Sequence, residues 1–167
     1  MEELALAYVA RFATTRAKLK GYLVRKLRER GWAADAVPDV EALAERFEQA
    51  GYIDDAAYDR AKAGSLLRRG YGMRRVGQAL GAAGVDEAVR ESVAPGERSR
   101  RAAALVMARK RRFGPFGSPP AERLQREKHI AAMLRAGHAM DHVLALLDAS
   151  SQQDAHDWVD AEEDDQR

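Results

Sequence analysis

The residues best suited to chemistry in this sequence are four arginines that flank two glycines. The stretch reads Arg68-Arg69-Gly70-Tyr71-Gly72-Met73-Arg74-Arg75-Val76. A guanidinium group donates paired hydrogen bonds to phosphate or carboxylate, and glycines permit a tight turn between two helices. The stretch therefore predicts a helix–turn–helix whose arginines contact phosphate, with Tyr71 packing across the turn. The alternative is that these long side chains cover helix faces and pair with neighbouring acids.

Two further segments are strongly basic. Residues 14–31 hold seven basic residues against one acid, and residues 98–112 hold seven and no acid. The side chains that we expect to bind a polyanion are Arg25, Lys26, Arg28 and Arg30 in the first segment and Arg109, Lys110, Arg111 and Arg112 in the second. Contacts from six to ten such residues would make binding fall roughly 10³- to 10⁵-fold between low and moderate salt. Few aromatic residues interleave with them, so base stacking is not expected to be the main force.

Other chemistries find little support. The chain has no cysteine, which excludes disulfides, zinc thiolates and cysteine nucleophiles. His138 and His142 have the spacing of a zinc-binding pair on a helix, but no third ligand is evident. No glycine-rich segment ends in the Gly-Lys-Ser/Thr of a nucleotide-binding loop. The adjacent Asp54 and Asp55 are interpreted as helix caps, not as an acid/base pair. We therefore expect neither a metal nor another cofactor.

Charge is distributed unevenly along the chain. The net charge is +2, but the last fourteen residues carry seven acids and one base, which leaves +8 on the remainder. A basic body with an acidic tail indicates a polyanionic partner, or a partner already bound to one. We expect residues 150–167 to be a disordered acidic tail in which only Trp158 and Val159 dock. No membrane span or secretory signal is evident, so a cytoplasmic location is expected.

The elements that position these residues are predicted to be helices throughout. Apolar residues recur three and four apart, and strand signals are nearly absent. Helices are expected over 4–12, 19–30, 38–50, 58–67, 73–83, 86–93, 98–112, 121–136 and 141–147, with a loop over 113–120. Tyr52 and Ile53 are expected to form a buried pair before the helix that Asp54 and Asp55 cap.

An internal repeat is visible in the spacing of three glycines. Gly31, Gly84 and Gly137 are 53 residues apart, and each follows an apolar residue by four positions. Each glycine also lies between an upstream helix pair and a short downstream helix. The predicted fold is therefore all-α: three tandem three-helix repeats (1–53, 54–96 and 97–149) that form an elongated curved body, followed by the tail. Coincidence in a sequence rich in alanine and leucine is the alternative.

Two of these stretches resemble the marked segments of the RecX family of recombination regulators. They are Gly51-Tyr52-Ile53-Asp54-Asp55 and the arginine-flanked turn from Arg68 to Val76, in the family's order and spacing. The resemblance extends over roughly residues 4–148. The chain departs from the family at Met73, where proline is usual, and in the Gly/Pro-rich stretch 113–120.

The resemblance implies a function without catalysis. Members consist of tandem three-helix repeats, bind in the groove of the RecA filament on single-stranded DNA, and restrain its strand exchange, ATP turnover and promotion of SOS-repressor cleavage. Several also bind DNA directly, so single-stranded and also double-stranded DNA are candidate ligands. We expect a monomer. Two other functions stay open: a free-standing helix–turn–helix protein that selects a DNA site, and a protein scaffold that is insensitive to nucleic acid.

Overall fold

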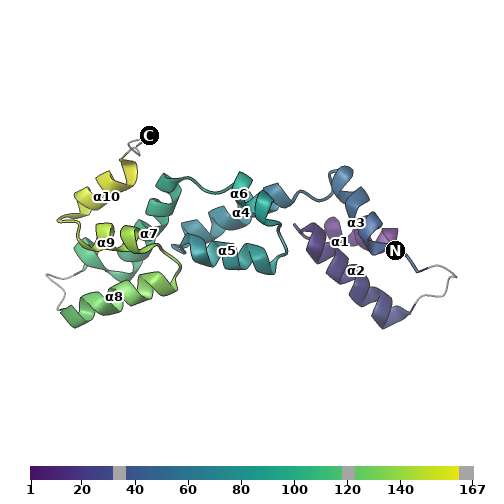
Figure 1. Ribbon diagram of the computed structural model, residues 1–167, viewed down its shortest axis with the longest axis horizontal. Coiled ribbons are helices and arrows are strands. Elements are labelled where there is room, and N and C mark those ends of the chain that lie inside the picture. The colour runs from purple at the N-terminus through teal and green to yellow at the C-terminus, as the bar shows by residue number, and fades with distance from the viewer. Residues whose placement is uncertain (32–36, 118–122, 162–167) are drawn as a thin grey trace. The chain divides into compact units, whose positions relative to one another are not determined.

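The described part of the chain is helical. The computed structural model describes residues 1–31, 37–117 and 123–161, and within these ranges it contains ten α-helices, one 3₁₀ turn and no strand (Figure 1). The helices are α1 (Glu2–Val9), α2 (Arg16–Arg30), α3 (Val40–Gln49), α4 (Asp55–Arg68), α5 (Met73–Ala82), α6 (Glu87–Ser92), α7 (Glu97–Arg111), α8 (Arg123–Arg135), α9 (Met140–Leu147) and α10 (Gln152–Asp160), with the 3₁₀ turn η1 (Gly114–Phe116). The predicted all-α class is therefore confirmed. No helix among the described residues is long and apolar enough to cross a membrane.

Polar caps and glycines set the ends of these helices. Thr15 caps α2 by accepting a hydrogen bond from the Lys18 amide, and the Asp54 carboxylate accepts one from the Ala57 amide at the start of α4. Gly31, Gly84 and Gly137 follow the second helix of each successive triplet with φ of 69°, 71° and 98°. Positive φ is costly for residues with a Cβ, so glycine ends the helix at the predicted positions.

Two compact units make up the chain, and their boundary lies within α4 and α5. Unit 1 contains Met1–Ala61 and Leu80–Val93, and unit 2 contains Lys62–Ala79 and Ala94–Arg167. The predicted repeat boundaries fall elsewhere, between α3 and α4 and between α6 and α7. These boundaries therefore stay a prediction.

Unit 1 is built around α2. The apolar side chains of α1 and α3 pack on one stripe of α2 and form a cluster of Ala5, Leu19, Leu23, Leu43, Ala44, Phe47 and Ile53. The start of α2 also receives the turn that follows α5. The buried Thr15 hydroxyl donates to the Ala83 carbonyl oxygen at 2.6 Å. A Cβ added to the neighbouring Gly84 would lie 2.3 Å from the Ala17 Cβ, so glycine permits this close approach.

Unit 2 has its own core, between α7, α8, α9 and α10. Its buried side chains are Ala104, Leu105, Met107, Ala108, Phe113, Met133, Val143, Leu146, Ala155 and Val159. The last two belong to α10, so the predicted disorder of the tail is wrong for Gln152–Asp160. Ser151 caps this helix, and Ala155 and Val159, four residues apart, bury one face. The part of the predicted tail from 162 to 167 lies outside the described residues.

Two smaller predictions also need correction. Ile53 is buried, but the Tyr52 side chain is 56% exposed, because its ring packs on the rim of Phe47 instead of entering the core. The predicted loop over 113–120 contains the turn η1, and Phe113, immediately before this turn, is buried. Residues 118–120 of that stretch lie outside the described residues.

Candidate nucleic-acid and partner interface

The arginine-flanked turn joins α4 to α5 within unit 2. Gly70 ends α4 with φ +85°, and its amide donates to the Leu67 carbonyl oxygen at 2.8 Å. A Cβ at Gly70 would lie 3.1 Å from the Met107 backbone nitrogen, so the turn packs directly on α7. Arg68, Arg69, Arg74 and Arg75 are all exposed. The predicted turn is therefore present, with its four arginines on the surface.

Backbone contacts hold this turn against the turn between α8 and α9. The Gly72 amide donates to the Ala136 carbonyl oxygen at 2.9 Å, and the Arg74 amide donates to the Gly137 carbonyl oxygen at 3.1 Å. A Cβ at Gly72 would lie 2.2 Å from the Gly137 carbonyl carbon. Both glycines are thus required for two backbones to touch, and we call this contact the glycine junction.

The same relation occurs in unit 1. There the start of α2 receives the residues around Gly84, as the start of α5 receives the residues around Gly137. In each case the residue before the glycine, Ala83 or Ala136, accepts a hydrogen bond from the N-cap position of the preceding triplet's second helix. This recurrence is a structural counterpart of the glycine spacing in the sequence.

A buried histidine, His138, contacts the arginine-flanked turn next to the glycine junction. It is 6% exposed, and its Nε2 lies 3.0 Å from the Gly70 carbonyl oxygen. A carbonyl only accepts, so Nε2 carries the proton. Burial lowers the pKa of His138, which favours the neutral ring. This role was not predicted, because the sequence places Gly70 and His138 far apart.

The four arginine side chains of this turn make different contacts. The Tyr71 ring lies near the guanidinium groups of Arg69 and Arg75, at 5.3 and 5.9 Å from centroid to Cζ. Arg74 instead donates from Nη2 to the Leu134 carbonyl oxygen at 2.5 Å, at the C-terminal end of α8. Among the described residues, no carboxylate lies within 4.0 Å of any of the four guanidinium groups. Arg69 and Arg75 therefore lie beside the Tyr71 ring, and no acid among the described residues neutralises them.

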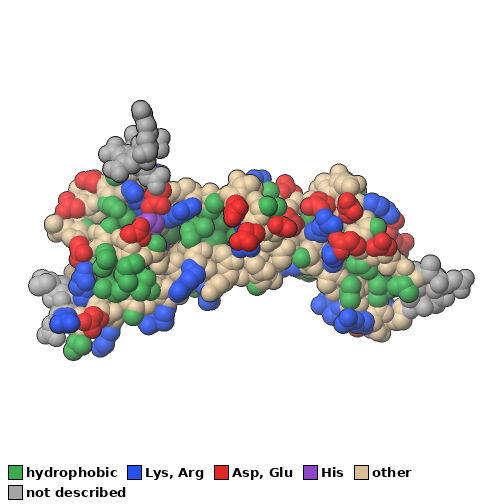
Figure 2. Space-filling view, viewed as in Figure 1, with side chains coloured by type: hydrophobic (Ala, Val, Ile, Leu, Met, Phe, Trp, Pro, Cys, Tyr) green, Lys and Arg blue, Asp and Glu red, His purple; other side chains and the backbone are tan. Residues whose placement is uncertain are grey.

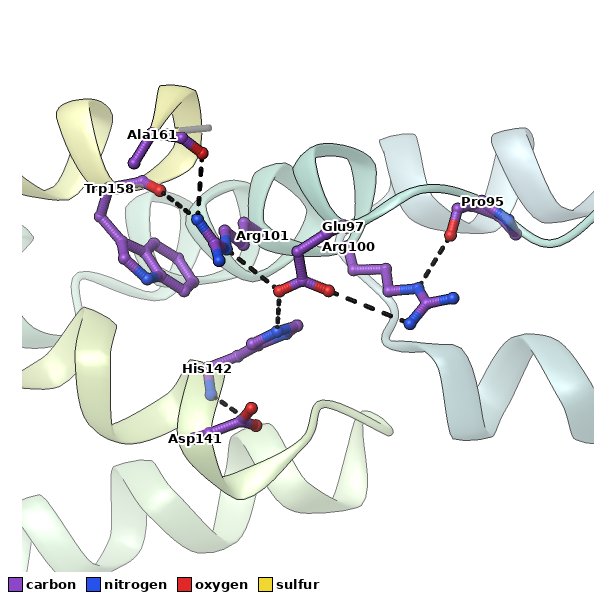
Figure 3. Close-up of polar contacts among 8 residues, drawn as sticks. All are labelled: Pro95, Glu97, Arg100, Arg101, Asp141, His142, Trp158 and Ala161. Carbon is purple, nitrogen blue, oxygen red and sulfur yellow. Dashed lines mark hydrogen bonds and ion pairs between the residues drawn. The ribbon is translucent and has the colours of Figure 1, made fainter. Parts of the chain in front are cut away.

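The first half of the basic segment in α7 is occupied internally. Glu97 accepts from Arg101 at 3.0 Å and from His142 at 2.5 Å, and Arg101 also donates to the carbonyl oxygens of Trp158 and Ala161 (Figure 3). Arg98 pairs with Asp160 of α10 through Nε and Nη2. For Arg98 and Arg101, the alternative given by the sequence is therefore correct: these arginines pair with neighbouring acids instead of remaining open to a ligand. The two histidines with the spacing of a zinc pair contact different acceptors: His138 contacts the Gly70 carbonyl oxygen, and His142 contacts the Glu97 carboxylate.

The other predicted basic residues differ in their surroundings. Lys26 and Arg25 share the carboxylate of Glu29, at 2.6 and 3.6 Å, whereas Arg28 and Arg30 have no carboxylate within 4.0 Å among the described residues. At the end of α7, all four of Arg109, Lys110, Arg111 and Arg112 are exposed. Cations at a helix C-terminus also interact favourably with the helix dipole. These four residues therefore stabilise α7 in addition to any binding role. The α2 set belongs to unit 1 and the others to unit 2.

Figure 2 shows the distribution of charge on one face. Within unit 2, Lys and Arg side chains gather over α8, whereas acidic side chains gather around α10. α10 therefore belongs to an acidic side of unit 2.

Comparisons with known proteins identify the family. No family model matches the chain. The chain is 34% identical over 159 residues to the regulatory protein RecX of Myxococcus xanthus, which covers 90% of this chain and 85% of that protein. The chain belongs to the RecX family. It is also 39% identical over 102 residues to the regulatory protein RecX of Thermus thermophilus, across 61% of this chain and 68% of that one.

The RecX fold is present as well. The crystal structure of RecX from Lactobacillus salivarius matches with a TM-score of 0.67 at 16% identity and covers 95% of this chain. The predicted three-helix repeats are thereby confirmed, and the 34% identity confirms the predicted resemblance to the family. Membership of the RecX family makes the protein a regulator of RecA and not an enzyme.

Proposed function

We propose that the protein binds the filament of RecA on single-stranded DNA in the cytoplasm, as a monomer, and mainly inhibits its recombinase, ATPase and coprotease activities. The RecX family supports RecA as the partner. The protein would act by occupancy, so that its surface, rather than a reacting group, carries the function.

This proposal depends on the arginine-flanked turn, which we call the arginine turn. Arg69 and Arg75 are exposed beside Tyr71, and the glycine junction fixes the backbone between them. Preorganised guanidinium groups bind phosphate or carboxylate with less loss of side-chain entropy than mobile ones. A filament of protein and DNA offers both kinds of anion.

One observation disfavours the alternative of a site-selecting helix–turn–helix protein. Such proteins place the N-terminal residues of the second helix against base edges. Here the amides of Gly72, which precedes α5, and of Arg74, in its first turn, donate to the turn after α8. These amides are therefore not available to a DNA phosphate, whereas the Arg74 and Arg75 side chains are exposed.

RecA-dependent ATP hydrolysis on single-stranded DNA tests the proposal. We expect the wild-type protein to lower the hydrolysis rate at a stoichiometric ratio, and the double variant Arg69→Gln/Arg75→Gln to need a higher concentration for the same effect. Arg98→Gln is the matched control, because Arg98 is exposed but paired with Asp160. Wild-type protein without effect on hydrolysis would contradict the proposal.

A further inference from the structure

Three aromatic rings from α1 and α2 form a row on unit 1. The Tyr8 and Tyr22 rings are stacked, with centroids 4.3 Å apart and planes 16° apart. Phe12 continues the row from Tyr8, at 5.3 Å and 48°. We call these three rings the aromatic row.

The two ends of the aromatic row differ. Tyr8 and Tyr22 are partly buried against the core of unit 1, so their packing has a structural role. Phe12 does not belong to that cluster, and 55% of its side chain is exposed. Its place at the end of the row therefore leaves an aromatic surface open to a ligand.

Cations flank the other end of the aromatic row. The Arg25 guanidinium and the Lys26 ammonium lie 5.6 and 6.0 Å from the Tyr22 ring centroid. Both share the single carboxylate of Glu29, so a net positive charge remains at this position. The exposed Arg28 and Arg30 follow on the same helix.

A surface that combines aromatic rings with basic side chains is typical of proteins that bind single-stranded nucleic acid. Unpaired bases stack on exposed rings, and basic side chains track the phosphates. Duplex DNA keeps its bases stacked internally and cannot use an exposed ring in this way. A purely protein partner would explain the exposed Phe12, but it would not require the cations at the Tyr22 end of the row.

We propose that the aromatic row is a stacking site for unpaired bases of single-stranded DNA, with Phe12 as the ring that receives a base and Arg25 and Lys26, at the Tyr22 end, as contacts to phosphates further along the strand. The proposal rests on the proposed function, since it specifies how the strand is held. It also departs from the sequence-based expectation that base stacking is minor, because the sequence does not show that rings of α1 and α2 come together.

Binding of a labelled oligothymidylate, measured by fluorescence anisotropy without RecA, tests the proposal. Phe12→Leu keeps apolar bulk and removes the aromatic face, whereas Phe12→Trp keeps the face. We expect Phe12→Leu to weaken binding on the order of ten-fold, in line with the loss of one stacked base, and Phe12→Trp to bind like the wild type. Tyr52→Leu is the matched control, because Tyr52 is equally exposed, at 56%, but lies outside the aromatic row.

An oligomer of the same length with abasic sites separates stacking from charge. Phe12→Leu should leave its binding unchanged, whereas Arg25→Gln/Lys26→Gln should weaken both oligomers. Equal oligothymidylate binding by wild type and Phe12→Leu would overturn the proposal, as would an equal loss for both oligomers. A Phe12→Leu variant that binds oligothymidylate normally but inhibits RecA poorly would assign the surface to protein contact and also overturn it. Wild-type protein that binds oligothymidylate through Phe12 but does not affect RecA would contradict only the proposed function.

Discussion

At the scale of single residues, Gly72 and Gly77 lie close in sequence but have different surroundings. A Cβ at Gly72 would lie 2.2 Å from the Gly137 carbonyl carbon, whereas a Cβ at Gly77 in α5 meets nothing within 4 Å. We expect Gly72→Ala to lower the free energy of unfolding by about 1–3 kcal/mol or more, because backbone must move. Gly77→Ala should raise it by up to about 1 kcal/mol, because alanine favours the helix. Urea unfolding followed by circular dichroism measures both, and equal effects would contradict a tight junction.

His138 predicts a dependence of stability on pH. Its folded-state pKa is lowered from 6.5 by burial, so the unfolded state takes up the proton more readily than the folded state. The stabilising contribution is therefore present above pH 6.5 and is lost as the pH falls through the folded-state pKa. His138→Gln keeps a donor for the Gly70 carbonyl but does not titrate. As the pH falls from 7.5 to 5.5, the wild type should lose unfolding free energy relative to His138→Gln. A difference between the two proteins that does not change with pH would exclude a buried neutral ring.

Single residues also show what the sequence alone could predict. The helix-ending role of Gly31, Gly84 and Gly137 was predictable, because positive φ is a local property of the backbone. The burial of Tyr52 was predicted wrongly, since whether a ring enters a core depends on residues distant in sequence. The junction of Gly72 with Gly137 depends on the same long-range packing, so only the turn itself was predictable.

At the scale of elements, α10 is a structural helix within the acidic C-terminal part of the sequence. Its Ala155 and Val159 are buried in unit 2, and Arg98 and Arg101 bind its C-terminal end. Composition alone indicated disorder here, because the acids conceal two apolar positions four residues apart. A helix that buries these positions belongs to the core, whatever its charge.

Two truncations test this assignment. Removal of residues 152–167 should lower the free energy of unfolding by about 2–5 kcal/mol, because the facing side chains of unit 2 lose their apolar cover. Removal of residues 162–167 alone should leave it within about 0.5 kcal/mol. Thermal and urea unfolding of both truncated proteins provide the measurement. Equal stability of the two would show that α10 contributes nothing to the core.

At the scale of the whole molecule, the positive charge belongs to one unit. Unit 1 holds 11 basic and 14 acidic residues, whereas unit 2 holds 17 and 12. Four of the acids in unit 2 lie in residues 162–167, beside one arginine. The predicted basic body is therefore a basic unit 2, and the sequence could not show this, because unit 2 combines segments from two parts of the chain.

The acidic end lowers the attraction of unit 2 for polyanions. Removal of residues 162–167 raises the net charge of that unit from +5 to +8. We expect this truncation to strengthen DNA binding at low salt and to have less effect as salt screens the charges. Anisotropy titrations at several salt concentrations measure the change. Affinity that is unchanged at low salt would show that these acids do not oppose DNA.

Salt dependence also distinguishes phosphate contacts from internal ion pairs. Each phosphate neutralised on a single strand contributes about 0.7 to the slope of log affinity against log salt. Arg69 and Arg75 have no carboxylate within 4.0 Å among the described residues, so Arg69→Gln/Arg75→Gln should reduce the slope by about 1.4 if both bind phosphate. Arg98 is already neutralised by Asp160, so Arg98→Gln should leave the slope unchanged. An unchanged slope for the double variant, with RecA inhibition still lost, would mean that the arginine turn binds carboxylates of RecA instead of DNA.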